Sequence, residues 1–294
     1  MKRFICNILV FFAVIVLVDI LFGLSQKYMM SHTTGGQTYC QYYTAKLSDE
    51  DIIMLGSSRM RHHYNPDLIE DSLNMTCFNS GEDGSGIIFN YGLYKMLTAR
   101  YTPKIIIYDL FSFDLYPDDN IKYLGWLRKF YDEPGIKDII TYVDKKEQIK
   151  CISSMYRYNT RCIATIADYL HPVRTYHKGY SAMAGRLDFE PDTYEYIPQQ
   201  LDTVKLHFLD LLIYDCNAKN IELVFCASPQ YAVPEDNHYY DQIAEYLKTK
   251  DVRFLNHFYC GEISEDRSLF SDQHHLNSQG ADKFTNLLIS EIRK

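Results

Sequence analysis

The longest apolar stretch of the chain lies at its N-terminus. It covers residues 4–24, with Asp19 as its single charged residue, and it follows Lys2 and Arg3. This is about the length that a helix needs to cross a bilayer. With basic residues before the span and no comparable apolar run later, the positive-inside rule places the N-terminus in the cytoplasm and the rest of the chain outside. We therefore predict a single-pass membrane anchor over residues 1–25.

A cleavable signal peptide is the alternative to an anchor, because Gly23-Leu24-Ser25 offers small residues around a cleavage point. The apolar run is longer than the hydrophobic region of a typical signal peptide, which favours the anchor. Asp19 would then lie near the outer end of the membrane helix, where the interface hydrates it at modest cost. A partner for Asp19 inside the membrane is the other interpretation.

Beyond residue 50, short apolar runs alternate with segments of helical periodicity. The strand-like runs cover 51–56, 75–79, 104–109, 221–226 and 252–255, and the helical segments cover 68–73, 87–97, 201–212 and 281–292. Strands that alternate with helices form a parallel sheet covered on both faces. Five such strands predict an α/β, flavodoxin-like three-layer sandwich over residues 51–294, with the active site at the carboxyl ends of the strands.

Two segments depart from this alternation. Residues 26–50 are polar, and we expect them to form a stalk between membrane and domain. Residues from about 117 to 199 combine a helical stretch at 149–170 with a polar, loop-rich part. We interpret them as an insertion that caps or extends the site. Tyrosines cluster between residues 156 and 196 and are suited to stacking on sugar rings, although ordinary partial burial also explains them.

Composition narrows the class of ligand. The formal net charge of −8 disfavours binding to nucleic acid through a general positive field. Of the eight cysteines, Cys6 lies in the anchor and the other seven show no regular spacing, so no disulfide framework follows. Cys151 and Cys162 are the candidates for a pair if the compartment is oxidising.

Candidate catalytic residues lie at two ends of the α/β pattern. Gly56-Ser57-Ser58 follows the first strand, and Asp272-Gln273-His274-His275 precedes the last helix. A hydroxyl is a poor nucleophile at neutral pH, so acyl transfer needs a histidine to accept its proton and a carboxylate to orient that histidine. Glycines in residues 79–84, after the second strand, let backbone N–H groups approach a substrate. Each fragment alone is explained by helix capping or a turn; their order along the chain favours catalysis.

These residues resemble the motifs of the SGNH, or GDSL-like, hydrolase superfamily. Gly56-Ser57-Ser58 matches its first block, Asn79-x-Gly81-x-x-Gly84 its second, and Asp272-x-x-His275-Leu276-Asn277 its last, so that the match covers roughly residues 51–116 and 200–294. The resemblance implies that Ser58 is the nucleophile, His275 the general base and Asp272 its orienting carboxylate. It places the N–H groups of Ser58 and Gly84 in the oxyanion hole and implies neither a metal nor a cofactor.

The third block departs from the family pattern. It usually reads Gly-x-Asn-Asp, whereas this chain has Phe111-Ser112-Phe113-Asp114. Phe113 cannot donate a hydrogen bond, and loss of one oxyanion donor costs about 10²- to 10³-fold in rate. Arg59, Ser112 and Asn79 are candidates to replace the missing donor or to contact substrate.

Other assignments stay open at this point. Ser57 is a rival nucleophile, because the geometry of the turn decides which hydroxyl faces the histidine, and His274 is a rival base. The adjacent histidines at 62–63 and 274–275 raise the option of a metal site. Neighbouring side chains diverge on most backbones and no His-x-x-x-His spacing is present, which disfavours a metal.

The anchored architecture is similar to that of SGNH-like proteins of envelope acylation systems, such as the D-alanyl transfer proteins of teichoic acid operons and polysaccharide O-acetylation proteins. The resemblance implies an extracytoplasmic serine esterase or acyltransferase in a bacterial-type cell membrane, acting on O-acyl groups of a cell-envelope glycan. It implies a multispanning membrane acyltransferase as partner, by analogy of architecture. The alternative is a catalytically weak glycan-binding or assembly protein of the same fold, which Phe113 and the large insertion favour.

Overall fold

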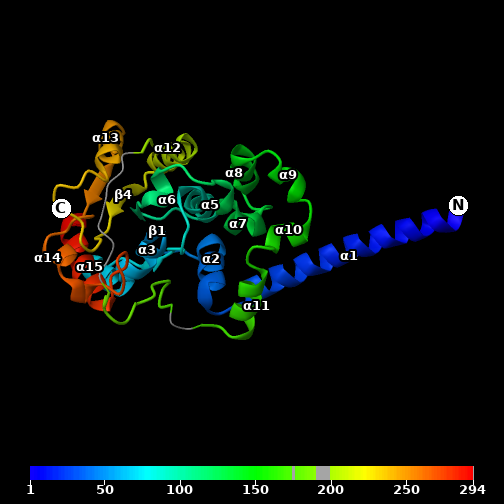
Figure 1. The fold of residues 1–294 in the computed structure, drawn as a ribbon, viewed down its shortest axis with the longest axis horizontal. Helices are drawn as coiled ribbons and strands as arrows, with labels where there is room; N and C mark the ends of the chain where they lie inside the picture. Colours follow the sequence, from blue (N-terminus) through cyan, green and yellow to red (C-terminus); the bar gives the residue numbers. More distant parts are fainter. Residues whose placement is uncertain (174–175, 190–198, 294) are drawn as a thin grey trace.

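The computed structural model of this protein describes residues 1–173, 176–189 and 199–293. Its centre is a sheet of five parallel strands in the order β2-β1-β3-β4-β5 (Figure 1). The strands are β1 (Ile52–Gly56), β2 (Cys77–Asn79), β3 (Ile105–Asp109), β4 (Glu222–Ala227) and β5 (Arg253–Asn256). This is the flavodoxin-like order. The predicted fold class is confirmed, and each strand begins and ends within two residues of its prediction.

Alternate residues of the strands enter two separate cores. Ile53 and Leu55 of β1 point into one core, and Ile52 and Met54 point into the other. The first core includes α2 (Gly36–Lys46), α5 (Ile87–Thr98), α12 (Thr203–Ala218) and α13 (Asp241–Thr249), and the second includes α3 (Ser58–His63), α4 (Pro66–Leu73) and α15 (Ser278–Ile292). Because both faces are covered, the inner strands are apolar throughout rather than alternating.

Short helical segments follow the carboxyl ends of β3 and β5. They are α6 (Ser112–Leu115), α14 (Glu262–Glu265) and the 3₁₀ turn η2 (Arg267–Leu269). The end of β3 also starts the insertion, which contains α7 (Ile121–Leu127), the 3₁₀ turn η1 (Arg128–Phe130), α8 (Ile136–Val143), α9 (Glu147–Lys150), α10 (Ser154–Tyr158) and α11 (Cys162–Leu170). The helical stretch expected at 149–170 is therefore divided into three short helices. Ser153 begins a new one because its hydroxyl accepts a hydrogen bond from the Tyr156 backbone N–H.

The loop-rich end of the insertion is described only in part. Residues 174–175 and 190–198 lie outside the described residues, and so do Tyr194 and Tyr196 of the predicted tyrosine cluster. All eight cysteines are free in the structure, including the candidate pair Cys151 and Cys162.

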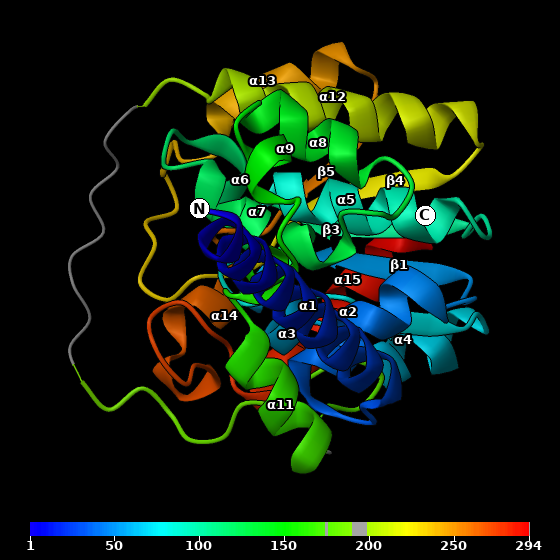
Figure 2. The ribbon, with the colours of Figure 1, turned by 90° about the vertical axis from the view of Figure 1, so that its right-hand side faces the viewer.

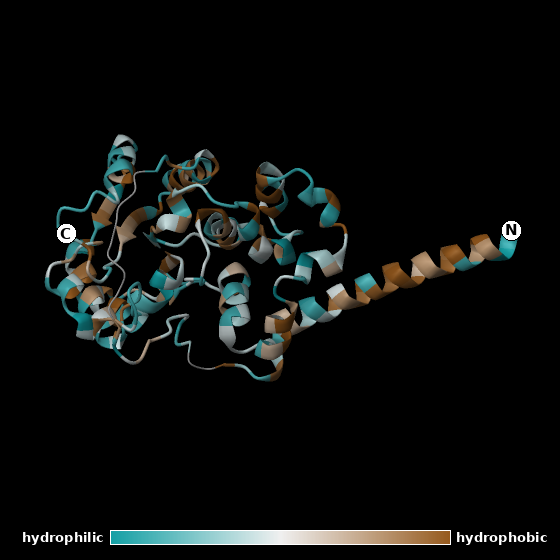
Figure 3. Ribbon diagram, viewed as in Figure 1, coloured by the Kyte–Doolittle hydropathy of each residue, from teal (hydrophilic) through white to brown (hydrophobic). Residues whose placement is uncertain are grey.

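The N-terminal helix α1 (Lys2–His32) is longer than the predicted anchor and projects from the domain (Figure 1). Residues 1–18 are exposed along their whole length, and this projecting part is largely apolar (Figure 3). Within the described residues, α1 is the one helix long and apolar enough to cross a membrane, a test that a signal sequence also passes. Its C-terminal part differs, since Gly23, Gln26 and Met30 are buried against the domain.

Residues 26–50, expected to be a stalk, are built into the domain. Helix α2 buries Cys40 and Ala45 in the core that contains α5. The Thr44 hydroxyl lies 2.7 Å from that of Ser80, and the Arg100 guanidinium donates to the carbonyls of α2. The polar composition of this segment suggested a stalk, but polar groups such as the Thr44 and Ser48 hydroxyls are paired inside the protein instead.

Candidate active site

The fold brings the predicted serine, histidine and aspartate together at the carboxyl edge of the sheet. Ser58 is the first residue of α3, immediately after the turn that ends β1, and the other two lie in the loop that precedes α15. Ser58 Oγ is 2.8 Å from His275 Nε2. His275 Nδ1 is 2.9 and 3.0 Å from the two carboxylate oxygens of Asp272. Both contacts are within the range expected of a nucleophile, its base and an orienting group.

Asp272 is held in its ionised form. Partial burial by itself would raise the pKa of the Asp272 carboxyl. Hydrogen bonds from the His275 ring and from the backbone N–H groups of His274 and His275 outweigh this effect and lower the pKa to about 2. An ionised Asp272 accepts only, so the proton of His275 lies on Nδ1. Nε2 is then free to accept the proton of Ser58. The local Asp-x-x-His spacing thus sets the tautomer as well as the position of the base.

His63 supports this loop from the core. Its Nε2 accepts the backbone N–H of Leu276 at 3.0 Å, and its Nδ1 therefore carries the proton and donates to Ser228 Oγ at 2.9 Å. Burial, together with the nearby Arg59 and His275, lowers the pKa of His63 well below 6.5. A neutral, fully buried histidine thus fixes the residue that follows the candidate base.

A buried polar network connects this support to the strand ends. Asp109, the last residue of β3, accepts hydrogen bonds from the Tyr64 hydroxyl at 2.6 Å and from the Ser228 backbone N–H at 2.9 Å. The Ser228 hydroxyl also donates to Asp109, at 3.2 Å. The pKa of Asp109 is raised by burial, although the nearby Arg59 lowers it in part. The network ties the ends of β3 and β4 to the helix that begins with Ser58.

Sequence reasoning missed these supporting residues. The available signal was the position of Asp109, an acidic residue that closes an otherwise apolar strand and is fully buried. Buried charges need partners, so an acidic residue at this position predicts a polar network, but the sequence does not identify the residues that form it. In the sequence, His63 stands out only as one of two adjacent histidines.

Arg59 and Asn79 both form hydrogen bonds within the protein. The Arg59 guanidinium is buried, donates to the hydroxyl and carbonyl oxygens of Ser228, and lies 4.8 Å from the centre of the Phe111 ring. The Asn79 amide donates both of its hydrogens, to the carbonyls of Met60 and Tyr64, and its oxygen accepts the Gly81 N–H. Neither group is presented to a substrate in this arrangement. Both hold the loops around Ser58.

The glycines after β2 have two different structural reasons. A Cβ at Gly81 would clash with the Arg61 backbone nitrogen and lie 2.9 Å from the Ser57 carbonyl oxygen. Glycine is therefore required for this loop to pack on the first turn of α3. Gly84 has a positive φ of 70°, and a Cβ there would meet no atom within 4 Å. Its N–H makes no hydrogen bond within the described residues, so this donor is not already used by the protein, as an oxyanion donor requires.

The rival residues are placed differently from the predicted ones. Ser57 is buried, and its hydroxyl has no hydrogen-bond partner in the described part of the chain. His274 Nδ1 lies 3.2 Å from the Gln230 side-chain oxygen, so its ring is directed to the loop after β4. Ser58 and His275 are the residues that face one another.

The segment that replaces the third block is braced by its aspartate. Asp114 accepts hydrogen bonds from the Tyr108 hydroxyl at 2.5 Å and from the Phe111 backbone N–H at 2.8 Å. Burial raises the pKa of Asp114 to about 7, although these hydrogen bonds lower it in part. The Phe113 ring packs against Phe111, with centres 5.7 Å apart. The Ser112 hydroxyl makes no hydrogen bond within the described residues. Of the three candidates to replace the missing oxyanion donor, Ser112 is therefore the one whose side chain is not used in an internal hydrogen bond.

The adjacent histidines diverge. His62 Nδ1 lies 2.6 Å from the Ser181 carbonyl oxygen, whereas His63 is directed to Ser228. Burial lowers the pKa of His62, as it does that of His274. In the described ranges, no three His, Cys, Asp or Glu side chains are grouped so that they could hold a metal ion.

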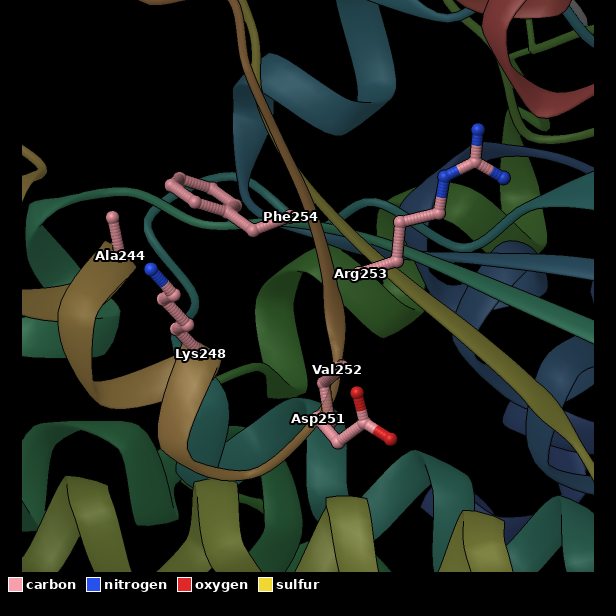
Figure 4. Close-up of a pocket in the computed structure, with 6 residues that line it drawn as sticks. All are labelled: Ala244, Lys248, Asp251, Val252, Arg253 and Phe254. Carbon is pink, nitrogen blue, oxygen red and sulfur yellow. The ribbon is translucent and has the colours of Figure 1, made fainter. Parts of the chain in front are cut away.

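A separate hollow of about 460 Å³ lies away from these residues. It is lined by Ala244, Lys248, Asp251, Val252, Arg253 and Phe254 (Figure 4). Residues 251–253 lead into the amino end of β5. Ligands of open parallel sheets bind at the carboxyl ends of the strands, so we assign this hollow no catalytic role.

Comparisons with known proteins find similar solved structures but no related sequence. No protein-family model matches the chain, and no curated protein matches it. Among solved structures, it is similar to a GDSL-like lipase from Bacteroides thetaiotaomicron, with a TM-score of 0.42, 10% identity and coverage of 87% of this chain and 98% of that chain. It is also similar to a proposed lipolytic protein of the G-D-S-L family from Desulfitobacterium hafniense, with a TM-score of 0.41, 9% identity and coverage of 81% and 97%. At such identities and TM-scores the activity has to be argued from the site itself.

Proposed function

We propose that this protein is a serine-dependent esterase or acyltransferase that works through an acyl-serine intermediate. The observation that carries the proposal is the continuous relay from Ser58 Oγ through the His275 ring to the Asp272 carboxylate. The three residues come from the start of α3 and from the loop before α15, more than two hundred residues apart, and helix capping would not require their side chains to meet.

The reaction follows from the hydrogen positions. Ser58 Oγ attacks the carbonyl carbon of an ester while His275 Nε2 takes its proton, and Asp272 stabilises the imidazolium that forms. Backbone N–H donors stabilise the negative oxygen of the tetrahedral intermediate, and we propose the N–H groups of Ser58 and Gly84 for this role. Collapse of the intermediate releases the alcohol, protonated by His275, and leaves the acyl group on Ser58. Water or a sugar hydroxyl, deprotonated by His275, then attacks the acyl-serine and gives either hydrolysis or transfer.

The proposed substrate is an O-acyl group of a cell-envelope glycan. The support is topological: α1 begins with the basic residues Lys2 and Arg3, and the rest of its projecting part is largely apolar. An anchor with that orientation holds the domain outside the membrane, where it meets envelope polymers. The implied partner is a multispanning membrane acyltransferase that supplies or receives the acyl group.

A fluorophosphonate probe tests the acyl-serine directly, because it reacts with a serine activated by a histidine. We expect covalent labelling of the full chain in detergent and turnover of small acetyl esters, and both should disappear in Ser58→Ala. Ser57→Ala is the matched control, since Ser57 is the adjacent, buried hydroxyl, and it should keep labelling.

Two outcomes would contradict the proposal. Labelling that survives Ser58→Ala but is lost in Ser57→Ala would move the nucleophile by one residue. A folded protein that neither reacts with the probe nor turns over acetylated glycans or small esters would instead favour the glycan-binding or assembly alternative, which the missing third-block donor supports.

A further inference from the structure

Asp19 attaches the apolar helix to the insertion. One of its carboxylate oxygens accepts the Ser153 hydroxyl at 2.6 Å and the Met155 N–H at 2.8 Å, and the other accepts the Ser154 N–H at 2.8 Å. One turn further along α1, a Cβ at Gly23 would lie 2.6 Å from the Ser154 side chain. The helix and the first turn of α10 are therefore in direct contact. Asp19, which the sequence left without a definite partner, is bound by the domain.

The position of Asp19 along α1 determines how deep in the bilayer the contact between α1 and the insertion lies. Residues 4–19 of a straight helix rise by about 22 Å, whereas the hydrocarbon core of a bilayer is about 30 Å thick. If Lys2 and Arg3 lie at the inner boundary, Asp19 lies short of the outer one. The backbone at residues 153–155 that binds it must then reach the boundary between headgroups and hydrocarbon. Three hydrogen bonds satisfy the carboxylate there, as required where water is scarce.

The insertion exposes apolar side chains at the same end of the domain. Helices α10 and α11 contact α1 where it leaves the domain, and α9 lies at the same end of the domain (Figures 1 and 2). We call their exposed large hydrophobic residues the collar: Ile149, Ile152, Met155, Ile163, Ile166 and Leu170. An exposed group of this kind marks an interaction surface rather than a random surface composition.

Helix α11 has the pattern of an interfacial helix. Ile163, Ile166 and Leu170 follow at helical spacing and are exposed, whereas Thr165 is buried and Asp168 accepts the Thr38 N–H from the domain side. A soluble domain packs the apolar stripe of such a helix inward, and here the stripe faces outward. Nearby, the ring of Tyr28 lies 6.2 Å from that of Tyr169. Tyrosines are typical of the membrane–water interface.

We propose that the collar inserts into the outer interface of the lipid bilayer, beside the anchor, so that the domain is seated on the membrane rather than tethered above it. The proposal rests on the membrane anchor of the proposed function. Its support is the continuity of the collar with the exposed apolar face of α1 and the depth at which Asp19 is bound. Retention of α1 follows as well, since cleavage near residue 25 would remove the carboxylate that binds the first turn of α10.

Tryptophan quenching by brominated lipid tests the insertion. The chain has one tryptophan, Trp126, so single-tryptophan variants can be made in a Trp126→Phe background of the full chain. Ile163→Trp, at a side chain that is 79% exposed, reports on the collar. Tyr214→Trp is the matched control, because Tyr214 is 70% exposed but lies on α12, away from α1. Phe12→Trp reports on the anchor.

The measurement compares vesicles of plain phosphatidylcholine with vesicles of phosphatidylcholine brominated near the glycerol end of one acyl chain. We expect bromination to reduce the fluorescence of Ile163→Trp and Phe12→Trp and to leave that of Tyr214→Trp unchanged. Leu170→Trp replaces Ile163→Trp if that variant does not fold. Because the vesicles contain only lipid and this chain, quenching cannot come from a partner protein.

The remaining outcomes separate two failures. Quenching of Phe12→Trp without quenching of either collar variant would overturn the collar proposal while keeping the anchor, and would point to a protein partner for the exposed residues. Absence of quenching in Phe12→Trp would overturn the anchor and the collar together. Neither result affects labelling of Ser58 by a fluorophosphonate, which tests the chemistry independently.

Discussion

Replacement of His63 by glutamine tests whether a neutral buried histidine supports the catalytic loop. His63 is fully buried, accepts from Leu276 and donates to Ser228. Burial holds its pKa well below 6.5 in the folded protein, whereas in the unfolded chain it titrates near 6.5. The unfolded state therefore binds more protons below this pH, and stability is lost as the pH falls through 6.5. Glutamine retains an acceptor of similar reach but does not titrate.

The size of the effect follows from proton linkage. If His63 stays neutral in the folded state down to pH 5.5, acidification from pH 8 removes about 1.4 kcal/mol of unfolding free energy through this residue. For a chain of this size that corresponds to about 2 to 3 °C in Tm. Burial also lowers the pKa values of His62 and His274, and they add losses of the same sign. Both proteins keep those two histidines, so the difference between wild type and variant isolates His63.

Thermal unfolding of the full chain in detergent at pH 8 and pH 5.5 measures this difference. His63→Gln is expected to have a lower Tm at pH 8, because an imperfectly replaced buried hydrogen bond costs about 1–3 kcal/mol. Its acid-induced drop in Tm should nevertheless be smaller than that of the wild type by the amount above. An equal drop in both proteins would refute the assignment of His63 as a neutral support.

Two further predictions concern the loops around Ser58. Asp272→Asn should lower kcat for a small ester by about 10³- to 10⁴-fold with little change in KM, since the carboxylate orients His275 and stabilises its charged form; a loss confined to KM would speak against this role. Gly81→Ala should lower Tm more than Gly84→Ala in the same thermal scans, because a Cβ at Gly81 meets the backbone of Arg61 whereas one at Gly84 enters open space. Equal losses would contradict this prediction and would mean that the steric contact at Gly81 costs no more than the positive φ at Gly84, which is worth about 1–2 kcal/mol.

The α/β framework was readable from the sequence because its signals are local. Each inner strand is an apolar run, and α4, α5, α12 and α15 carry apolar residues at helical spacing, so the fold class and strand positions needed no long-range information. The segment before β1 was harder to interpret. Residues 36–46 are polar in composition, and only the packing of α2 on α5 and the pairing of Thr44 with Ser80 show that they belong to the domain.

The sequence also indicated the candidate site, because the chemistry restricts the residue types and the topology brings strand ends to one edge. It did not establish which serine faces the histidine, since Ser57 and Ser58 differ by one position in a turn. It could not assign Arg59 and Asn79 to internal hydrogen bonds either, because both have the chemistry of a substrate ligand and only the partners decide their use.

The sequence by itself determined the strands, the main periodic helices, the apolar N-terminal helix and the residue types of the candidate site, since these depend on patterns within a few residues of one another. The tertiary structure decided what depends on residues far apart in the chain: the contact of Ser58 with His275, the support of Leu276 by His63, and the binding of Asp19 by the insertion. Directional hydrogen bonds and close packing exist only when distant segments have met. Composition and spacing cannot supply them.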